Sequence, residues 1–252
     1  MLKFREIGHS SMLIAGSLRL FFTFLGHFFL TLFNPRNQHL TIHWAILTKT
    51  IYLSGARLML PVSIISGILG FSLALTLFPI FNGFHLGRHA LPIAQMAVVS
   101  YLAPLSVGII LSIQSALNLI NASVHELQLS LDETMYEYIF PVMLGIILTG
   151  VLLYVYALFA ALVGVYLTFQ YVHNVDVYDH LVHLANTISW YTLDYSLLKV
   201  FIYCIIIALV VGYYYYKIAL RLISLRKAVS RVMTRSLLCI IVFSAYSNIF
   251  NL

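Results

Sequence analysis

The stretch that decides the fold is VMLGIILTGVLLYVYALFAALVGVYLTFQYV, residues 142–172, which contains no charged side chain. A helix needs about 20 consecutive apolar residues to cross the hydrocarbon core of a bilayer, and this run is longer. Because its backbone hydrogen bonds close within the segment, a helix is stable in lipid where an irregular chain is not. Residues 142–172 therefore predict a membrane-spanning helix.

The rest of the chain has the same apolar character. Hydrophobic residues make up 62% of the 252 residues and charged residues only 9%, whereas soluble domains carry about a quarter charged residues. The net charge is +6, which could indicate a nucleic-acid-binding protein. The basic residues, however, lie between the apolar runs, where they orient a membrane protein. We therefore expect a membrane protein and no nucleic-acid partner.

Further apolar runs complete the predicted fold. They predict spans at 51–81, 92–120, 196–216 and 236–250, in addition to 142–172. The last run is short and is expected to take residues from the basic segment before it. Residues 11–33 contain Arg19 and His27, which favours a helix lying in the membrane interface, an elbow helix. No repeat divides the chain, so residues 1–252 are predicted to form a single all-α integral membrane domain.

The basic residues predict an orientation. Short loops rich in Lys and Arg stay on the cytoplasmic side of a membrane. Five spans with a cytoplasmic N-terminus place both basic groups inside: the one before residue 51, and the one within 217–235. The same count places the loop 173–194, with its His and Asp residues, outside. Arg57 and Lys199 lie near span ends, so we expect both to extend their charges towards the membrane surface.

An acidic segment at residues 125–140 is the most informative loop feature. Its apolar residues recur every three or four positions, which predicts a short amphipathic helix on the cytoplasmic side. An anionic inner leaflet would repel its carboxylates, so a protein partner such as the groove of an ATPase suits it better than lipid. A plain surface connector is the alternative. The candidate coupling residues are His125, Glu126, Asp132, Glu133 and Glu137.

Two stretches resemble the MlaE/YrbE-type permeases, the membrane subunits of ABC systems that move phospholipid together with MCE-domain proteins. The first stretch is ILTKTIYLSGARLMLPVSIISGILGFSLAL at residues 46–75, and the second is LISLRKAVSRVMTRSLL at residues 222–238. Pro104 also sits where the family has the Pro of a Glu-Leu-Gly-Pro segment. The residues that carry the resemblance are Tyr52, Gly55, Ser66, Gly67, Gly70, Ala228 and Arg231.

The resemblance implies a non-catalytic permease subunit in a bacterial inner membrane, with an organelle inner membrane as the alternative. Its implied partners are ABC ATPase subunits, a second permease chain, an MCE-domain protein and phospholipid. No cofactor is expected in this chain, which has no P-loop, and ATP and Mg²⁺ would bind the ATPase. The implied lipid-contacting residues are Leu73, Leu77, Phe81, Tyr101 and Leu102, although apolar residues on spans more often pack against helices or face bulk lipid.

The chain departs from the family pattern at two charged sites. It has Ser100-Tyr101-Leu102-Ala103-Pro104 where the family has Arg-Glu-Leu-Gly-Pro, and Ile113-Gln114-Ser115-Ala116 where the family has Gly-Arg-Ala-Gly. A diverged homodimer and one member of an unequal pair both remain open.

Two other classes of function compete with the permease. One is a structural or assembly subunit of a larger membrane complex, such as a respiratory complex, in which the acidic helix docks a neighbour. The other is an intramembrane enzyme that uses the outer loop, where Asp176, Asp179, His180 and His183 have the spacing of metal ligands on a helix. A solvated connecting loop is the simpler interpretation of that array, so no metal site is predicted.

Overall fold

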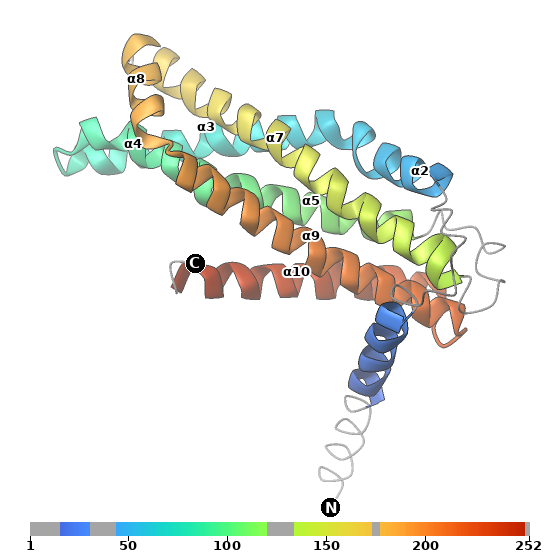
Figure 1. The fold of residues 1–252 in the computed structure, drawn as a ribbon. Coiled ribbons are helices and arrows are strands. Elements are labelled where there is room, and N and C mark those ends of the chain that lie inside the picture. The colour runs from blue at the N-terminus through green and yellow to red at the C-terminus, as the bar shows by residue number, and fades with distance from the viewer. Residues whose placement is uncertain (1–15, 31–43, 120–133, 173–176, 250–252) are drawn as a thin grey trace, which may run out of the picture.

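The computed structural model describes residues 16–30, 44–119, 134–172 and 177–249 (Figure 1). These residues are almost entirely helical, and no strand occurs among them. In chain order the elements are a helix at Gly16–Leu30, α2 (Trp44–Ser54), η1 (Ala56–Leu58), α3 (Met59–Gly83), α4 (Gly87–Ala97), η2 (Val98–Leu102), α5 (Ala103–Asn118), η3 (Thr134–Ile139), α7 (Phe140–Tyr171), α8 (Val177–Thr187), α9 (Trp190–Ala219) and α10 (Leu225–Ile249).

Five stretches of helix in the described part of the chain are long and apolar enough to cross a membrane. The prediction of an all-α membrane protein with five spans is therefore confirmed. The spans are Trp44–Gly83, His89–Asn118, Thr134–Tyr171, Trp190–Ala219 and Leu225–Ser247.

All five spans begin earlier than the sequence predicted, and three of them differ by seven residues or more. The first begins at residue 44 rather than 51, the third at 134 rather than 142, and the last at 225 rather than 236. In the last case, most of the predicted basic loop is helical. Its small and apolar residues recur every fourth position and are buried, so one face packs on the bundle while the charged face stays exposed. These buried residues are Ala228, Val232, Ser236 and Ile240.

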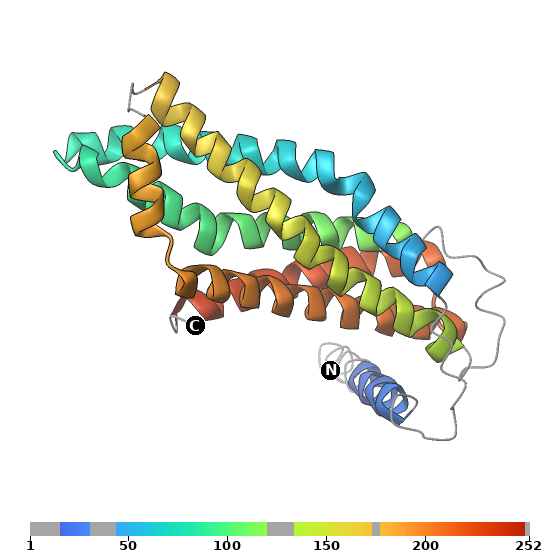
Figure 2. The same ribbon diagram turned by 45° about the horizontal axis from the view of Figure 1, so that its top comes forward.

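The bundle has two distinct ends (Figures 1 and 2). At one, the hairpin end, α3 turns into α4 and the short helix α8 lies beside them. At the other, the basic end, α2 begins and α9 turns into α10 near Lys217, Arg221, Arg226 and Lys227. Each span runs from one end to the other, in alternating directions along the chain.

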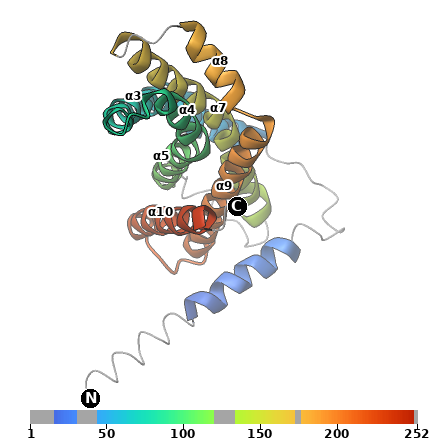
Figure 3. The same ribbon diagram turned by 90° about the vertical axis from the view of Figure 1, so that its left-hand side faces the viewer.

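Helix α7 is the central element. It packs on α2 and α3 on one side and on α9 on another, while α10 lies against α5 and α9 (Figure 3). The crossing of α3 and α7 depends on glycine, because a Cβ on Gly70 would collide with the Ala161 carbonyl and one on Gly164 with the Gly67 carbonyl. Small residues at such a crossing let two backbones approach closely within a membrane.

The helix Gly16–Leu30 runs across the bundle rather than along it, and lies at the basic end (Figures 1 and 3). Phe24 is fully buried, with its ring centre 5.6 Å from that of Tyr216 on α9. The Tyr213 hydroxyl donates to the Ser17 carbonyl at 3.0 Å. Large apolar side chains on its other faces are exposed, among them Phe22 and Leu30, as expected of a helix in a membrane interface.

Candidate functional site

The predicted lipid-contacting residues come together at the hairpin end. Leu73, Leu77 and Phe81 of α3 and Leu102 of η2 are partly buried against one core cluster. Tyr101, in the same turn as Leu102, is 48% exposed. The buried members of that cluster are Ala74, Ala90, Leu91, Ala94, Val98, Ala161, Val165 and Phe169. The five residues thus border a mixed surface of packed and accessible apolar groups.

A π-helical turn, η2, sets the position of Tyr101. Pro104 has no backbone N–H, so it cannot donate to the carbonyl four residues earlier, and the helix widens just before it. The N–H of Ala103 accordingly donates to the carbonyl of Val98, five residues back. The widened turn also leaves the Val99 carbonyl to accept a hydrogen bond from Ser196 of α9 at 2.5 Å.

Lys199 of α9 is a charged group that the sequence placed differently. We predicted that its ammonium would extend to the membrane surface, but the residue is 4% exposed. Its Nζ lies 4.7 Å from the ring centre of Tyr101 and 4.4 Å from that of Tyr195. Aromatic faces attract cations, and most strongly where water is excluded. The prediction was wrong because Tyr101 comes from a different helix, and its approach to Lys199 leaves no signal in the local sequence, although Tyr195 lies four residues before Lys199 on α9 itself.

The neighbouring polar groups are also paired. The Tyr154 hydroxyl of α7 donates to Ser196 at 2.8 Å, and Ser196 in turn donates to Val99. This chain of hydrogen bonds links α7, α9 and η2 beside the Lys199 cage. Chemically, the hairpin end therefore combines an apolar surface with one buried positive charge, a pairing that suits an amphiphile with an anionic group.

Most of the predicted coupling residues lie outside the described part of the chain: His125, Glu126, Asp132 and Glu133. Glu137 is described, and it is half-buried in η3. The last third of the predicted helix 125–140 is not part of a separate helix, because η3 runs directly into α7. Met135 and Ile139 are buried in the main core and Tyr138 packs on Tyr215 of α9, which anchors this turn to the bundle.

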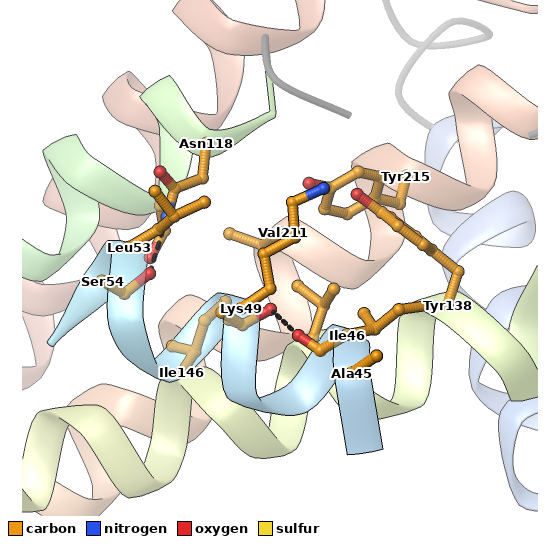
Figure 4. A pocket seen from close by; sticks show the side chains of 13 residues that line it. Ala45, Ile46, Lys49, Leu53, Ser54, Asn118, Tyr138, Ile146, Val211 and Tyr215 are labelled. Atoms are coloured by element: carbon orange, nitrogen blue, oxygen red, sulfur yellow. Dashed lines mark hydrogen bonds between the residues drawn. The ribbon is translucent and has the colours of Figure 1, made fainter. Parts of the chain in front are cut away.

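A cavity of about 210 Å³ opens at the basic end, where side chains from α2, α5, α7 and α9 meet (Figure 4). On one wall, Asn118 donates to Ser54 at 2.6 Å and Gln114 donates to Asn118 at 3.1 Å. Lys49 and Ser115 also line it. The Ser115 hydroxyl is buried and has no hydrogen-bond partner among the described residues. Sequence reasoning missed this cavity, since its residues come from four separate helices.

The His and Asp array of the loop 173–194 is described only in part. Residues 177–187 form α8, but Asp176 and the side chains of Asp179 and His180 lie outside the description. Among the described side chains, no group of three or more His, Cys, Asp or Glu residues is placed to hold a metal ion. The structure therefore leaves the metal alternative untested.

Comparison with known proteins supports the permease interpretation. The family model described as Permease MlaE matches residues 47–250, most of the chain. No curated protein matches it. The match spans both stretches that carry the resemblance, and the structure gives two of their glycines, Gly67 and Gly70, a packing role at the α3–α7 crossing. The matched range also includes Ser100-Tyr101 and Gln114, the positions at which this chain lacks the charged residues of the family.

On this evidence of sequence match and five-span fold, the chain belongs to the MlaE permease family and is a permease subunit of an ABC-type transporter.

Proposed function

We propose that this chain is a non-catalytic permease subunit that moves phospholipid, powered by a separate ATPase and working with an MCE-domain protein. The observation that carries the proposal is the family match over residues 47–250. The apolar surface at the hairpin end and its buried cation support a lipid substrate, because an acyl chain and an anionic headgroup need those two environments. Leu73, Leu77, Phe81, Tyr101 and Leu102 would contact acyl chains.

The charge distribution supports an orientation for this transporter. The basic end carries Lys217, Arg221, Arg226 and Lys227 around the α9–α10 turn, so the positive-inside rule places that end in the cytoplasm. The loop 120–133 joins α5 to η3, whose adjoining ends both lie at the basic end, where an ATPase would bind. The hairpin end would then face the outer side of a bacterial inner membrane. A second permease chain, identical or unlike, would complete the transporter.

Coupling would work through the loop between the second and third spans. When the ATPases bind ATP and Mg²⁺ and close, they would press on this loop and on Glu137 behind it. Since η3 is continuous with α7, and α7 packs on α2, α3 and α9, movement at the loop would reach most of the bundle. The cavity beside Ser115 gives these helices room to shift at the basic end.

Isolation of the full chain from its native membrane, in mild detergent, tests the proposal. We expect a P-loop ATPase and an MCE-domain protein to co-purify. Respiratory subunits in their place would instead favour the assembly-subunit alternative. The purified complex, reconstituted in vesicles, should move labelled phospholipid only when ATP is present.

Charge reversal tests the coupling site. The triple change Glu126→Lys, Asp132→Lys and Glu133→Lys should weaken ATPase association about tenfold or more, because each carboxylate facing a basic groove is replaced by a repelling charge. The control is Asp194→Lys, which reverses one exposed acid at the hairpin end. Equal ATPase recovery with the triple variant and with the wild type would remove the coupling assignment.

A further inference from the structure

A second and larger cavity lies at the basic end, between the helix Gly16–Leu30 and the helices α9 and α10. Its volume is about 990 Å³. Leu18, Leu20 and Phe21 of the crossing helix form an apolar wall. Lys217 of α9 with Arg231 and Arg235 of α10 supply positive charge on the opposite side. The apolar surface at the hairpin end lies at the other end of the bundle, so this cavity is a separate feature.

The three cations converge although they come from two helices. Arg231 and Arg235 are four residues apart on α10 and therefore share one face of that helix. Lys217 is only 9% exposed, with its Nζ 4.5 Å from the ring centre of Tyr213. The Arg235 guanidinium lies 5.7 Å from the ring centre of Tyr214. None of the described residues that line the cavity is acidic, so an anion would meet three positive charges there.

Tyr214 provides an independent sign of a ligand. Its side chain is fully buried, it lines the same cavity, and its hydroxyl has no hydrogen-bond partner among the described residues. Buried hydroxyl groups in folded proteins are nearly always hydrogen-bonded. A phosphate oxygen in the cavity would accept from this hydroxyl and from the arginine guanidinium groups, which match phosphate geometry with paired donors.

The surroundings of the cavity identify the kind of anion. A soluble phosphate has no apolar group that could contact the wall formed by Leu18, Leu20 and Phe21. The exposed apolar residues Phe22 and Leu30 belong to the same crossing helix, which places the cavity at the level of a membrane surface. A lipid satisfies both requirements, with its phosphate on the cations and its acyl chain along the apolar wall.

We propose that this cavity binds an anionic phospholipid of the leaflet at the basic end, which holds the crossing helix against α9 and α10. This lipid is a bound component rather than the transported substrate, so the inference goes beyond the proposed transport function. It requires no ATPase, no MCE-domain protein and no transport activity.

Native mass spectrometry of the purified full chain in nanodiscs tests this inference. The discs contain phosphatidylglycerol and phosphatidylcholine in equal amounts. The measured quantity is the amount of each lipid that stays bound to the protein after its release from the disc. We expect retained phosphatidylglycerol in the wild type, and about tenfold less in the double variant Arg231→Gln, Arg235→Gln, since each cation near a membrane surface contributes to anionic lipid binding. Tyr214→Phe, which removes only the hydroxyl, should reduce retention about threefold.

The matched control is the double variant Arg226→Gln, Lys227→Gln, which removes two exposed charges from the start of the same helix without touching the cavity. Its phosphatidylglycerol retention should stay within about twofold of the wild type. An equal loss in both double variants would mean that a diffuse surface charge, not a built site, attracts the lipid. That result would overturn the proposal, and so would equal retention of both lipids by the wild type.

The thermal stability of the wild type with added ligand distinguishes a lipid from a free anion, and this measurement needs no variant. Short-chain phosphatidylglycerol added to the detergent-solubilised wild type should raise its Tm, because a ligand that binds only the folded state stabilises it. Inorganic phosphate at equal ionic strength should not. If both ligands raise the Tm to the same extent, the cavity is a soluble-anion site; if neither does, it binds no phosphate group.

Discussion

The two halves of the bundle are packed in opposite ways. In the hairpin-end half, α3 and α7 meet through glycines with their backbones in direct contact, and the core cluster is made largely of alanine, valine and leucine. In the basic-end half, aromatic side chains lie between the crossing helix and α9, a Cβ on Gly145 or Gly212 would first meet side chains rather than backbone of the facing helix, and two cavities remain. Close backbone contact leaves little freedom for relative motion, whereas cavities lined by several helices leave room for it. We therefore expect structural stability to come mainly from the first half and adaptability from the second.

The largest effect should come from the glycine crossing. Gly70→Ala and Gly164→Ala each place a methyl group against a backbone carbonyl of the facing helix, where no side chain can move aside. We expect each change to lower the free energy of unfolding in mixed micelles by about 3 kcal/mol. Gly83→Ala is the control, since nothing lies within 4 Å of an added Cβ there. Wild-type stability of Gly70→Ala would show that the crossing is looser than the structure indicates.

The next largest effect concerns the only described cation caged at the hairpin end. Lys199→Met keeps the length of the side chain but removes its charge from between Tyr101 and Tyr195. If the charge attracts the lipid headgroup, ATP-dependent phospholipid transport in vesicles should fall about tenfold. Tyr101→Phe retains the aromatic face and should keep near wild-type transport, while Tyr101→Leu should resemble Lys199→Met. Undiminished transport by Lys199→Met would limit the role of this cation to packing.

A smaller effect is expected from the polar wall at the basic end. Asn118→Ala removes the donor to Ser54 and one acceptor of Gln114, so Ser54 loses this partner while the Gln114 amide still donates to the Leu53 carbonyl at 3.3 Å. The free energy of unfolding should fall by about 1–2 kcal/mol. Thr48→Ala is a suitable control, because the Thr48 hydroxyl is bonded only to carbonyls of its own helix turn. A loss no greater than that of Thr48→Ala would mean that the Asn118–Ser54 bond does not hold α2 to α5.

The smallest expected effect is a change in the free energy of unfolding with the opposite sign. Ser115→Ala deletes a buried hydroxyl that has no hydrogen-bond partner among the described residues. We expect the free energy of unfolding to stay level or to rise by up to about 1 kcal/mol, because an unpaired polar group no longer needs to be buried. Thermal unfolding in micelles measures this. A clear loss of stability would show that the hydroxyl has a partner in the working protein.

Sequence reasoning reached the spans more easily than their ends. The five apolar runs were recognisable because membrane insertion depends on the hydrophobicity of consecutive residues, which is a local property. Their first turns were placed too late wherever charged residues interrupted the apolar pattern. At residues 225–235 the burial of Ala228 and Val232 maintains the helix despite four nearby charges, and only packing on the bundle reveals this.

The residues of the candidate site also divide into those that the sequence predicted and those that only packing revealed. Leu73, Leu77, Phe81 and Leu102 came from a family resemblance, and the structure does place them around one cluster. The caged Lys199, the cavity beside Ser115 and the group of Lys217, Arg231 and Arg235 had no counterpart in that reasoning. Each of them combines side chains from different helices.

By itself, then, the sequence determined that this is a five-span membrane protein of a recognisable permease type, with basic residues gathered towards one end. Whether a long apolar run is buried in lipid depends on the composition of that run alone. The charges that flank it can likewise be read directly from the sequence. Only the tertiary structure decided which charges converge, which glycines let helices touch, and that the Tyr214 hydroxyl has no hydrogen-bond partner among the described residues. These outcomes depend on how each helix is rotated against its neighbours, and that rotation is set by the packing of all the helices together.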